Sequence, residues 1–201
     1  RPARRPGCRC RRRRWSCRRA CRRPSRGGAR DAVRHLVGLG RTRIAHITGP
    51  LDQTSAVDRL DGFRDVMVDA DPRLIVEGDF TPAGGERAMR ELLARCPELD
   101  AVFAANDVSA SGALRVLREL GRRVPEDVAV VGFDDMLPVA EQSDPPLTTV
   151  RQDIEEMGRL MARLLFRGLE RRAGDARADE GPVGTPSSVV LPTTLVRRAS
   201  A

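Results

Sequence analysis

The most constraining feature of this sequence is a regular alternation of short apolar runs with amphipathic segments between residues 28 and 150. The apolar runs lie at 43–50, 74–79, 100–107 and 127–135, and segments with helical spacing of apolar residues lie at 28–40, 55–70, 82–96 and 108–121. Strands that alternate with helices form right-handed β-α-β units, which build parallel sheets. The sequence therefore predicts an α/β fold in which a parallel sheet is flanked by helices on both faces.

The chain divides into three parts by composition and pattern. Residues 1–27 form an arm rich in arginine and cysteine, and residues 28–150 carry the alternating pattern. Residues 151–201 contain a long amphipathic helix at about 153–172, a loop rich in Gly, Asp, Ala and Pro, and a final extended segment. We expect the middle part to be one complete lobe of the protein.

The basic charge of the chain is confined to the arm. Residues 1–26 contain 13 arginines and no acid, whereas the remaining 175 residues carry 23 arginines and 28 acids. Three interpretations of the arm are open: a basic tail that neutralises nucleic-acid phosphates, a metal site, or the product of a GC-rich coding sequence read in another frame. The spacings of its cysteines, C-x-C, C-x6-C and C-x3-C, match no common zinc pattern. We predict no metal and no cofactor.

The sequence contains neither a membrane span nor a secretory signal. No apolar stretch approaches the ~20 residues that cross a bilayer, and the arm lacks the apolar region of a signal peptide. We therefore expect a cytoplasmic protein that does not contact a membrane, with Cys96 as a reduced thiol.

Polar residues and one aromatic residue follow the ends of all four predicted strands. In an open parallel sheet, ligands bind beyond the carboxyl ends of the strands. The residues expected at this edge of the sheet are Thr48, Gly49, Asp79, Phe80, Asn106, Asp107, Asp134 and Asp135. Carboxylates and an amide suit ligand hydroxyls, and an aromatic ring suits the C–H face of a sugar.

Five segments carry a resemblance to a known family: "RIAHITGP", "DRLDGF", "AVFAAND", "GALRVLRELGRRVPEDVAVVGFDD" and "PPLTTVRQDIEEMGRLMARLL". In this order and at these separations, they resemble the effector-binding domain of the LacI/GalR family of bacterial transcriptional regulators. The resemblance runs from about residue 27 to residue 198. It implies a periplasmic-binding-protein-like fold, here with one complete lobe plus the C-terminal elements of the other.

The resemblance also implies a ligand-binding set of five residues. Arg59 lies in "RLDGF", Asn106 in "AND", and Asp134 is the first acid of "GFDD". Phe80 corresponds to an aromatic residue that packs on the sugar, and Gln152 lies in the segment after "PPLTTV". Asp107 and Asp135 are secondary ligand candidates.

Each assignment has an ordinary structural alternative. The acids and Asn106 could cap a helix or turn, Arg59 could pair with Asp58 or Asp61 on a helix surface, and Phe80 could cover the sheet edge. His35 and His46 have no acid–nucleophile partner at a recognisable spacing, and we assign no catalytic residue.

The sequence departs from the family pattern by containing neither the helix-turn-helix nor most of the first lobe. In the family, the long helix and part of the closing strand pack on that lobe. An apolar stripe on this helix is therefore expected to lie exposed and to favour self-association. The stripe consists of Ile154, Met157, Leu160, Met161, Leu164 and Leu165.

The function predicted from the resemblance is that of a domain that senses a sugar or related polyol within a DNA-binding regulator, without enzymatic activity. Its implied partners are the small-molecule effector, operator DNA through a helix-turn-helix that this chain lacks, and a second copy in a homodimer. Two alternatives remain: a freestanding sugar-binding protein, and an α/β hydrolytic enzyme that uses Asp134 or Asp135. The sequence lacks the phosphate-binding loop and the G-x-S-x-G elbow of common hydrolytic enzymes.

Overall fold

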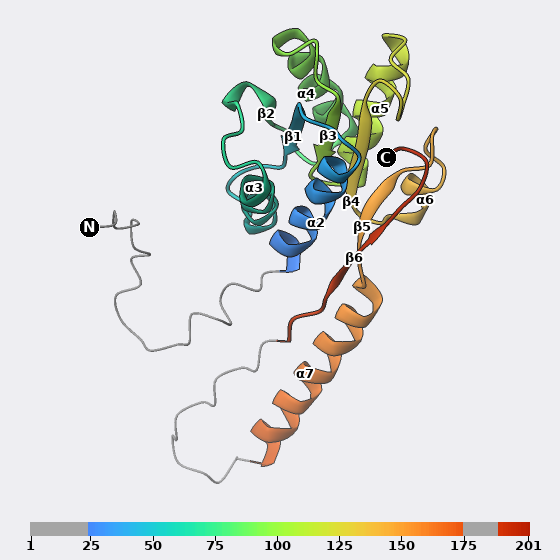
Figure 1. Cartoon of the computed structure of the whole chain (residues 1–201). Helices are drawn as coiled ribbons and strands as arrows, with labels where there is room; N and C mark the ends of the chain where they lie inside the picture. The colour runs from blue at the N-terminus through green and yellow to red at the C-terminus, as the bar shows by residue number, and fades with distance from the viewer. Residues whose placement is uncertain (1–23, 175–188) are drawn as a thin grey trace, which may run out of the picture.

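The computed structural model describes residues 24–174 and 189–201, which form a six-stranded sheet flanked by helices (Figure 1). The predicted arm up to residue 23, with Cys8, Cys10, Cys17 and Cys21, and most of the predicted loop lie outside the described residues. The strand order is β2-β1-β3-β4-β5-β6, and the first five strands are mutually parallel. Their bounds are β1 Ile44–Thr48, β2 Ile75–Glu77, β3 Ala101–Ala104, β4 Ala129–Asp134 and β5 Thr148–Gln152.

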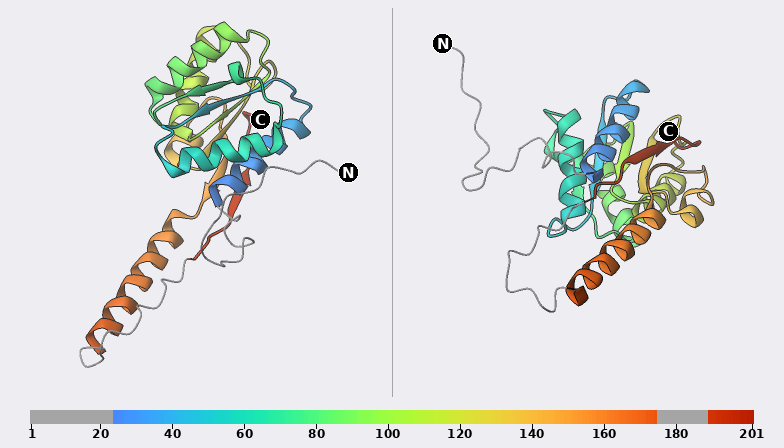
Figure 2. Two further views of the ribbon diagram at one scale, coloured as in Figure 1. Left: turned by 90° about the vertical axis from the view of Figure 1, so that its left-hand side faces the viewer. Right: turned by 90° about the horizontal axis from the view of Figure 1, so that it is seen from below.

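Two pairs of helices cover the two faces of the sheet (Figure 2). Helices α2 (Pro24–Gly38) and α3 (Thr54–Val66) pack on one face, and α4 (Pro82–Arg95) and α5 (Asp107–Glu119) pack on the other. Successive strand residues point to opposite faces, so Val130 joins the core under α4 and α5, whereas Val131 joins the core under α2 and α3. The predicted α/β class with a helix-flanked parallel sheet is therefore confirmed.

Short-range sequence signals set the ends of these helices. Pro82 occupies the first turn of α4, and the Thr81 hydroxyl accepts a hydrogen bond from Gly84 N at 3.0 Å. Gly40 and Gly121, which follow α2 and α5, have φ values of 81° and 67°. Glycine reaches this left-handed region without steric cost, which explains why both helices end there.

The C-terminal strand joins the edge of this sheet. The last strand, β6 (Thr193–Val196), pairs antiparallel with β5. The tail after β6 is also fixed to this sheet, because Ser200 Oγ donates to the Val130 carbonyl at 2.6 Å. At the other end, α2 begins at Pro24, so the predicted boundary at residue 27 falls inside a helix.

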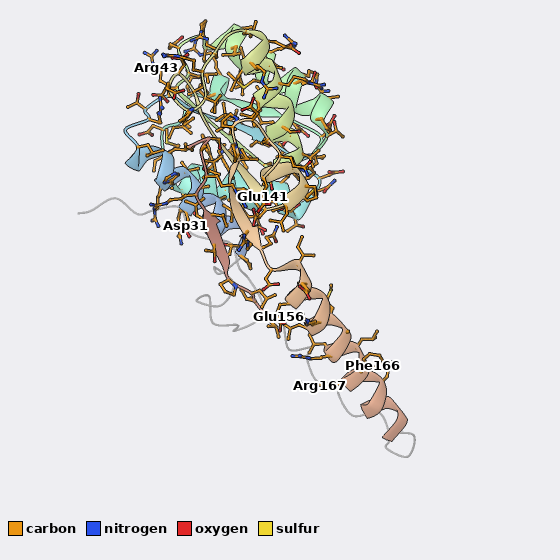
Figure 3. All side chains as sticks on the ribbon, turned by 90° about the vertical axis from the view of Figure 1, so that its right-hand side faces the viewer. Asp31, Arg43, Glu141, Glu156, Phe166 and Arg167 are labelled. Atoms are coloured by element: carbon orange, nitrogen blue, oxygen red, sulfur yellow. The ribbon has the colours of Figure 1, made fainter. Side chains whose placement is uncertain are left out.

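Helix α7 (Ile154–Gly174) leaves the carboxyl end of β5 and extends away from the body of the domain (Figures 1 and 2). Figure 3 shows Phe166 and Arg167 on this projecting helix, and the Phe166 side chain is 63% exposed. Ile154, Met161 and Leu165 are 61–63% exposed, so the exposure predicted for the apolar stripe is confirmed at these residues. Met157 and Leu160 of the same stripe are half-buried. Within the described residues, no helix combines the length and apolarity required to span a membrane.

Candidate functional site

The five predicted ligand residues lie at the carboxyl edge of the parallel strands, where they form two directly bonded groups. In the first group, Arg59 Nη2 and Gln152 Nε2 each donate to Asp134 Oδ1 at 2.8 Å. In the second, Asn106 Nδ2 donates to the Phe80 carbonyl at 3.2 Å. The Arg59 guanidinium carbon lies 5.9 Å from the centre of the Phe80 ring and so connects the two groups.

Arg59 is a buried cation that reaches the site from α3. Besides Asp134, its guanidinium donates to the carbonyl of Ala105 and lies over the Phe133 ring, 3.9 Å from the ring centre. Burial lowers the pKa of the Arg59 guanidinium, and the neighbouring Asp134 carboxylate opposes that shift. Because the guanidinium is a strong base, the group stays charged and fixes a positive charge at the strand ends.

Asp134 lies in a strained turn at the end of β4 and has one carboxylate oxygen without a hydrogen bond among the described residues. Asp134 has a φ of 102° and Asp135 a φ of 55°. Residues other than glycine rarely adopt positive φ values. Arg59 and Gln152 both use Oδ1. Among the described residues, Oδ2 is therefore the oxygen open to a ligand hydroxyl, and the Asp134 side chain is 22% exposed.

Phe80 lies flat against the end of β1. Its φ is 62°, and a Cβ added at Gly49 would come within 2.1 Å of Phe80 Cζ. Only glycine at position 49 therefore allows the ring to approach the β1 backbone this closely. The half-buried ring forms a flat apolar wall beside the polar groups.

Asn106 has a structural role at the start of α5. Its Oδ1 accepts from Ser109 N at 2.8 Å and from Ser109 Oγ at 2.6 Å, which makes it the N-cap of the helix. Because the oxygen is occupied and one amide hydrogen is given to Phe80, a single N–H remains for a ligand.

The two secondary candidates, Asp135 and Asp107, are both buried. Asp135 accepts from Arg151 Nε at 2.5 Å and from Arg198 Nη2 at 2.8 Å, and its side chain is 1% exposed. Asp107 is fully buried, where its carboxylate accepts from Met136 N and Thr149 Oγ1. Burial raises the pKa of Asp107 to about 6. The structure thus favours internal bonding roles for both residues.

Several contributors to the site carried no recognisable signal in the sequence. Phe133 resembles any buried strand residue, and the Ala105 carbonyl belongs to the backbone. The sequence places Gly49 at a strand end, but its close approach to the Phe80 ring depends on the positive φ of Phe80.

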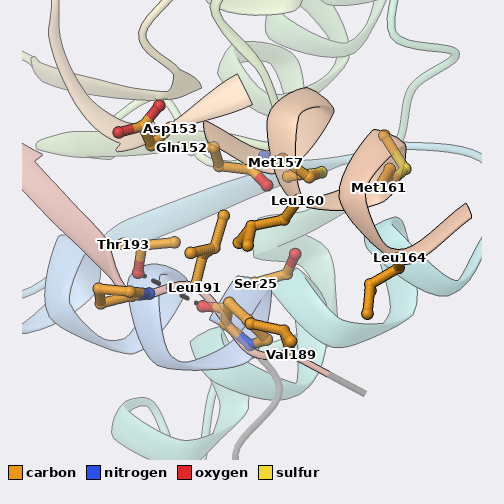
Figure 4. Close-up of a pocket in the computed structure, with 12 residues that line it drawn as sticks. Ser25, Gln152, Asp153, Met157, Leu160, Met161, Leu164, Val189, Leu191 and Thr193 are labelled. Atoms are coloured by element: carbon orange, nitrogen blue, oxygen red, sulfur yellow. Dashed lines mark hydrogen bonds between the residues drawn. The ribbon is translucent and has the colours of Figure 1, made fainter. Parts of the chain in front are cut away.

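A separate apolar groove of about 320 Å³ adjoins this site, and Gln152 lines it (Figure 4). The groove lies between α7 and the segment 189–193, with Met157, Leu160 and Leu191 on its walls. No cluster of three metal-ligating side chains occurs in the residues that the structure describes.

The sequence model of the periplasmic binding protein-like domain family matches residues 33–201. The chain is 49% identical over 178 residues to the HTH-type transcriptional regulator CelR of Thermobifida fusca, covering 87% of this chain and 49% of that protein. The solved CelR–cellobiose complex superimposes with a TM-score of 0.80 at 47% identity, covering 89% of this chain and 52% of that one. A lac repressor dimer bound to operator and the anti-inducer ONPF gives a TM-score of 0.74 at 33% identity, covering 88% and 50%.

These similarities agree with the resemblance carried by the sequence motifs. The chain spans about half the length of the curated relatives it matches. The match extends over the sheet, its flanking helices and the C-terminal strand. The chain therefore belongs to the periplasmic binding protein-like domain family, in the form that LacI/GalR-type transcriptional regulators carry.

Proposed function

We propose that this chain is the effector-sensing part of a transcriptional regulator and that its effector is a sugar. The observation that carries this proposal is the Arg59–Asp134–Gln152 network at the strand ends, beside the Phe80 ring. An acceptor oxygen next to fixed donors suits paired sugar hydroxyls, and the ring suits the C–H face of a pyranose. Because the CelR structure is a cellobiose complex, cellobiose is the first ligand to test.

In the complete regulator, effector binding would change the affinity for operator DNA, and DNA would change the affinity for effector by the same factor. The DNA contacts would come from a helix-turn-helix outside the residues that the structure describes. We further propose that the regulator acts as a homodimer in the cytoplasm, which follows from operator binding by a related dimer.

We do not expect catalysis at this site. A hydrolytic role for Asp135 would require an accessible carboxylate, but two arginines enclose it. Asp134 is held by Arg59 and Gln152 rather than by a general base. A freestanding sugar-binding protein remains the alternative, although the relatives are transcriptional regulators.

The proposal is tested by NMR, by following the backbone amide resonances of the chain during titration with cellobiose to millimolar concentration. We expect dose-dependent chemical-shift changes at Phe80, Asn106, Asp134 and Gln152. Asp134→Asn should abolish these shifts while keeping a side chain that tolerates the positive φ. The exposed Arg87→Gln change should leave them intact.

Mannitol serves as the matched ligand, because it has hydroxyls but no ring to lie on Phe80. Shifts with cellobiose alone would support ring stacking. Equal shifts with both ligands would indicate a polyol site. No shifts with either ligand, or shifts confined to residues away from the strand ends, would overturn the proposed effector class.

A further inference from the structure

Asp107 occupies an unusual position for an acid with no contact to solvent. As the first residue of α5, it places its carboxylate between the end of β4, the middle of β5 and the turn that follows β4. Oδ2 accepts from Met136 N at 2.8 Å, and Oδ1 accepts from Thr149 Oγ1 at 2.5 Å. The carboxylate also fills the space above Gly132, where an added Cβ would come within 2.3 Å of Oδ1.

The turn that Asp107 contacts carries the open oxygen of the candidate site. Asp134 and Asp135 hold consecutive positive φ values of 102° and 55°, a conformation that costs free energy unless its surroundings maintain it. Arg151 and Arg198 hold the Asp135 side chain, and Asp107 holds the next backbone N–H, that of Met136. Asp107 thus bonds the backbone of the turn, in addition to the side-chain contacts of Asp134 and Asp135.

The burial of Asp107 disfavours its charged form, and its hydrogen bonds to Thr149 and Met136 favour that form. Burial raises the pKa of its carboxyl, and the charges of Asp134 and Asp135 act in the same direction, while the two hydrogen bonds oppose them. Arg59 is the cation that faces it from α3. The cost of burying this carboxylate is offset by its two hydrogen bonds, one from the Met136 N–H and one from the Thr149 hydroxyl.

We propose that Asp107 is a positioning residue for the effector. By accepting from Met136 N and the Thr149 hydroxyl, it holds the Asp134–Met136 turn in the conformation that places Asp134 beside Arg59 and Gln152. This inference rests on the proposed function, because Asp134 is taken there as the carboxylate that meets the ligand.

The test compares Asp107→Asn with Asp107→Ala in the full chain. An asparagine keeps both contacts if its oxygen accepts from Met136 N and its NH₂ donates to a rotated Thr149 hydroxyl. An alanine removes both contacts. Cellobiose affinity should fall about tenfold or more in Asp107→Ala and stay within about threefold of the parent chain in Asp107→Asn.

Val116→Ala is the control for a general loss of stability. It removes buried side-chain volume from the same helix and does not alter the turn. Amide hydrogen exchange at Met136 should accelerate in Asp107→Ala but not in Val116→Ala. If Asp107→Ala does not fold, Thr149→Val removes one of the two contacts and should give an intermediate loss of affinity.

Equal affinities for Asp107→Ala and Asp107→Asn, or unchanged exchange at Met136 in Asp107→Ala, would overturn the positioning role. If the parent chain itself binds no cellobiose, the proposed effector fails. The exchange of Met136 still decides in that case whether Asp107 holds the turn, because it is measured without ligand.

Discussion

At the residue scale, Arg59 illustrates how one buried cation organises several groups of the site. It donates to the Asp134 carboxylate and the Ala105 carbonyl and lies over the Phe133 ring. Arg59→Met keeps most of the apolar packing but removes all donors. We expect it to lower the free energy of unfolding by about 1–3 kcal/mol, because two acceptors lose their partner.

Urea unfolding measures this change, with Arg87→Met as the matched control. Arg87 contacts Asp79 at 3.5 Å on the surface, and both side chains are largely exposed. Such exposed pairs contribute little, so the control should change stability by less than about 0.5 kcal/mol. Similar losses in the two variants would show that the network around Arg59 adds nothing beyond a surface ion pair.

His46 is predicted to make stability depend on pH. Its ring lies between Phe63 and Phe103, and burial lowers the pKa of His46 to about 4 despite a hydrogen bond between Nδ1 and the Phe103 carbonyl. The unfolded chain takes up a proton near pH 6.5. The stability from the neutral ring is therefore present above pH 6.5 and is lost as the pH falls toward 4.

Asp107 makes stability depend on pH in the opposite direction, over nearly the same pH range. Its pKa is raised to about 6, so the folded chain binds a proton there before the unfolded chain does, and stability increases as the pH falls from 6 toward 4. The two contributions partly cancel in the parent chain. His46→Leu should therefore change the acid dependence of unfolding by on the order of 3 kcal/mol between pH 6.5 and 4.

Urea unfolding at several pH values tests this, with His35→Leu as control. Burial also lowers the pKa of His35, but this residue is only partly buried. Its substitution should therefore have a smaller effect on the slope of unfolding free energy against pH. Asp107→Asn should steepen the loss of stability in acid. An unchanged slope in His46→Leu would contradict the buried neutral ring.

At the scale of elements, the C-terminal tail connects two neighbouring strands of the sheet through Ser200. Its hydroxyl donates to the Val130 carbonyl at 2.6 Å and accepts from Thr148 N at 2.8 Å, so it connects β4 and β5. Ser200→Ala removes both contacts and should lower the free energy of unfolding by about 1–2 kcal/mol. Amide exchange at Thr148 should accelerate, whereas the exposed Arg197→Ala should leave it unchanged.

The elements show which parts of the structure the sequence can and cannot predict. Alternating apolar runs predicted β1 to β4 and their carboxyl edge, because burial on both faces leaves a clear pattern. The pairing of β6 was not predictable, since an extended segment does not indicate which sheet it joins. Asp134 and Asp135 also look alike in sequence. Their different roles depend on two positive φ values and on arginines distant in the chain.

At the scale of the whole molecule, the projecting helix α7 and its groove give the chain an apolar face beside the candidate site. Met157, Leu160 and Leu164 line the groove, and Ile154, Met161 and Leu165 continue the surface on α7. An exposed apolar surface of this extent favours association. We therefore expect concentration-dependent self-association of the chain through α7.

A paired change on the stripe tests this expectation. Met161→Glu with Leu165→Glu places two charges on the exposed apolar face, and burying them against another copy would carry a large desolvation cost. Sedimentation velocity over a series of concentrations should then show a monomer where the parent chain forms larger species. Arg163→Glu, on another side of the same helix, provides a charged control that should associate like the parent. Equal association of all three proteins would place the contact surface elsewhere, and a parent chain that stays monomeric would show that the apolar face of α7 does not drive association.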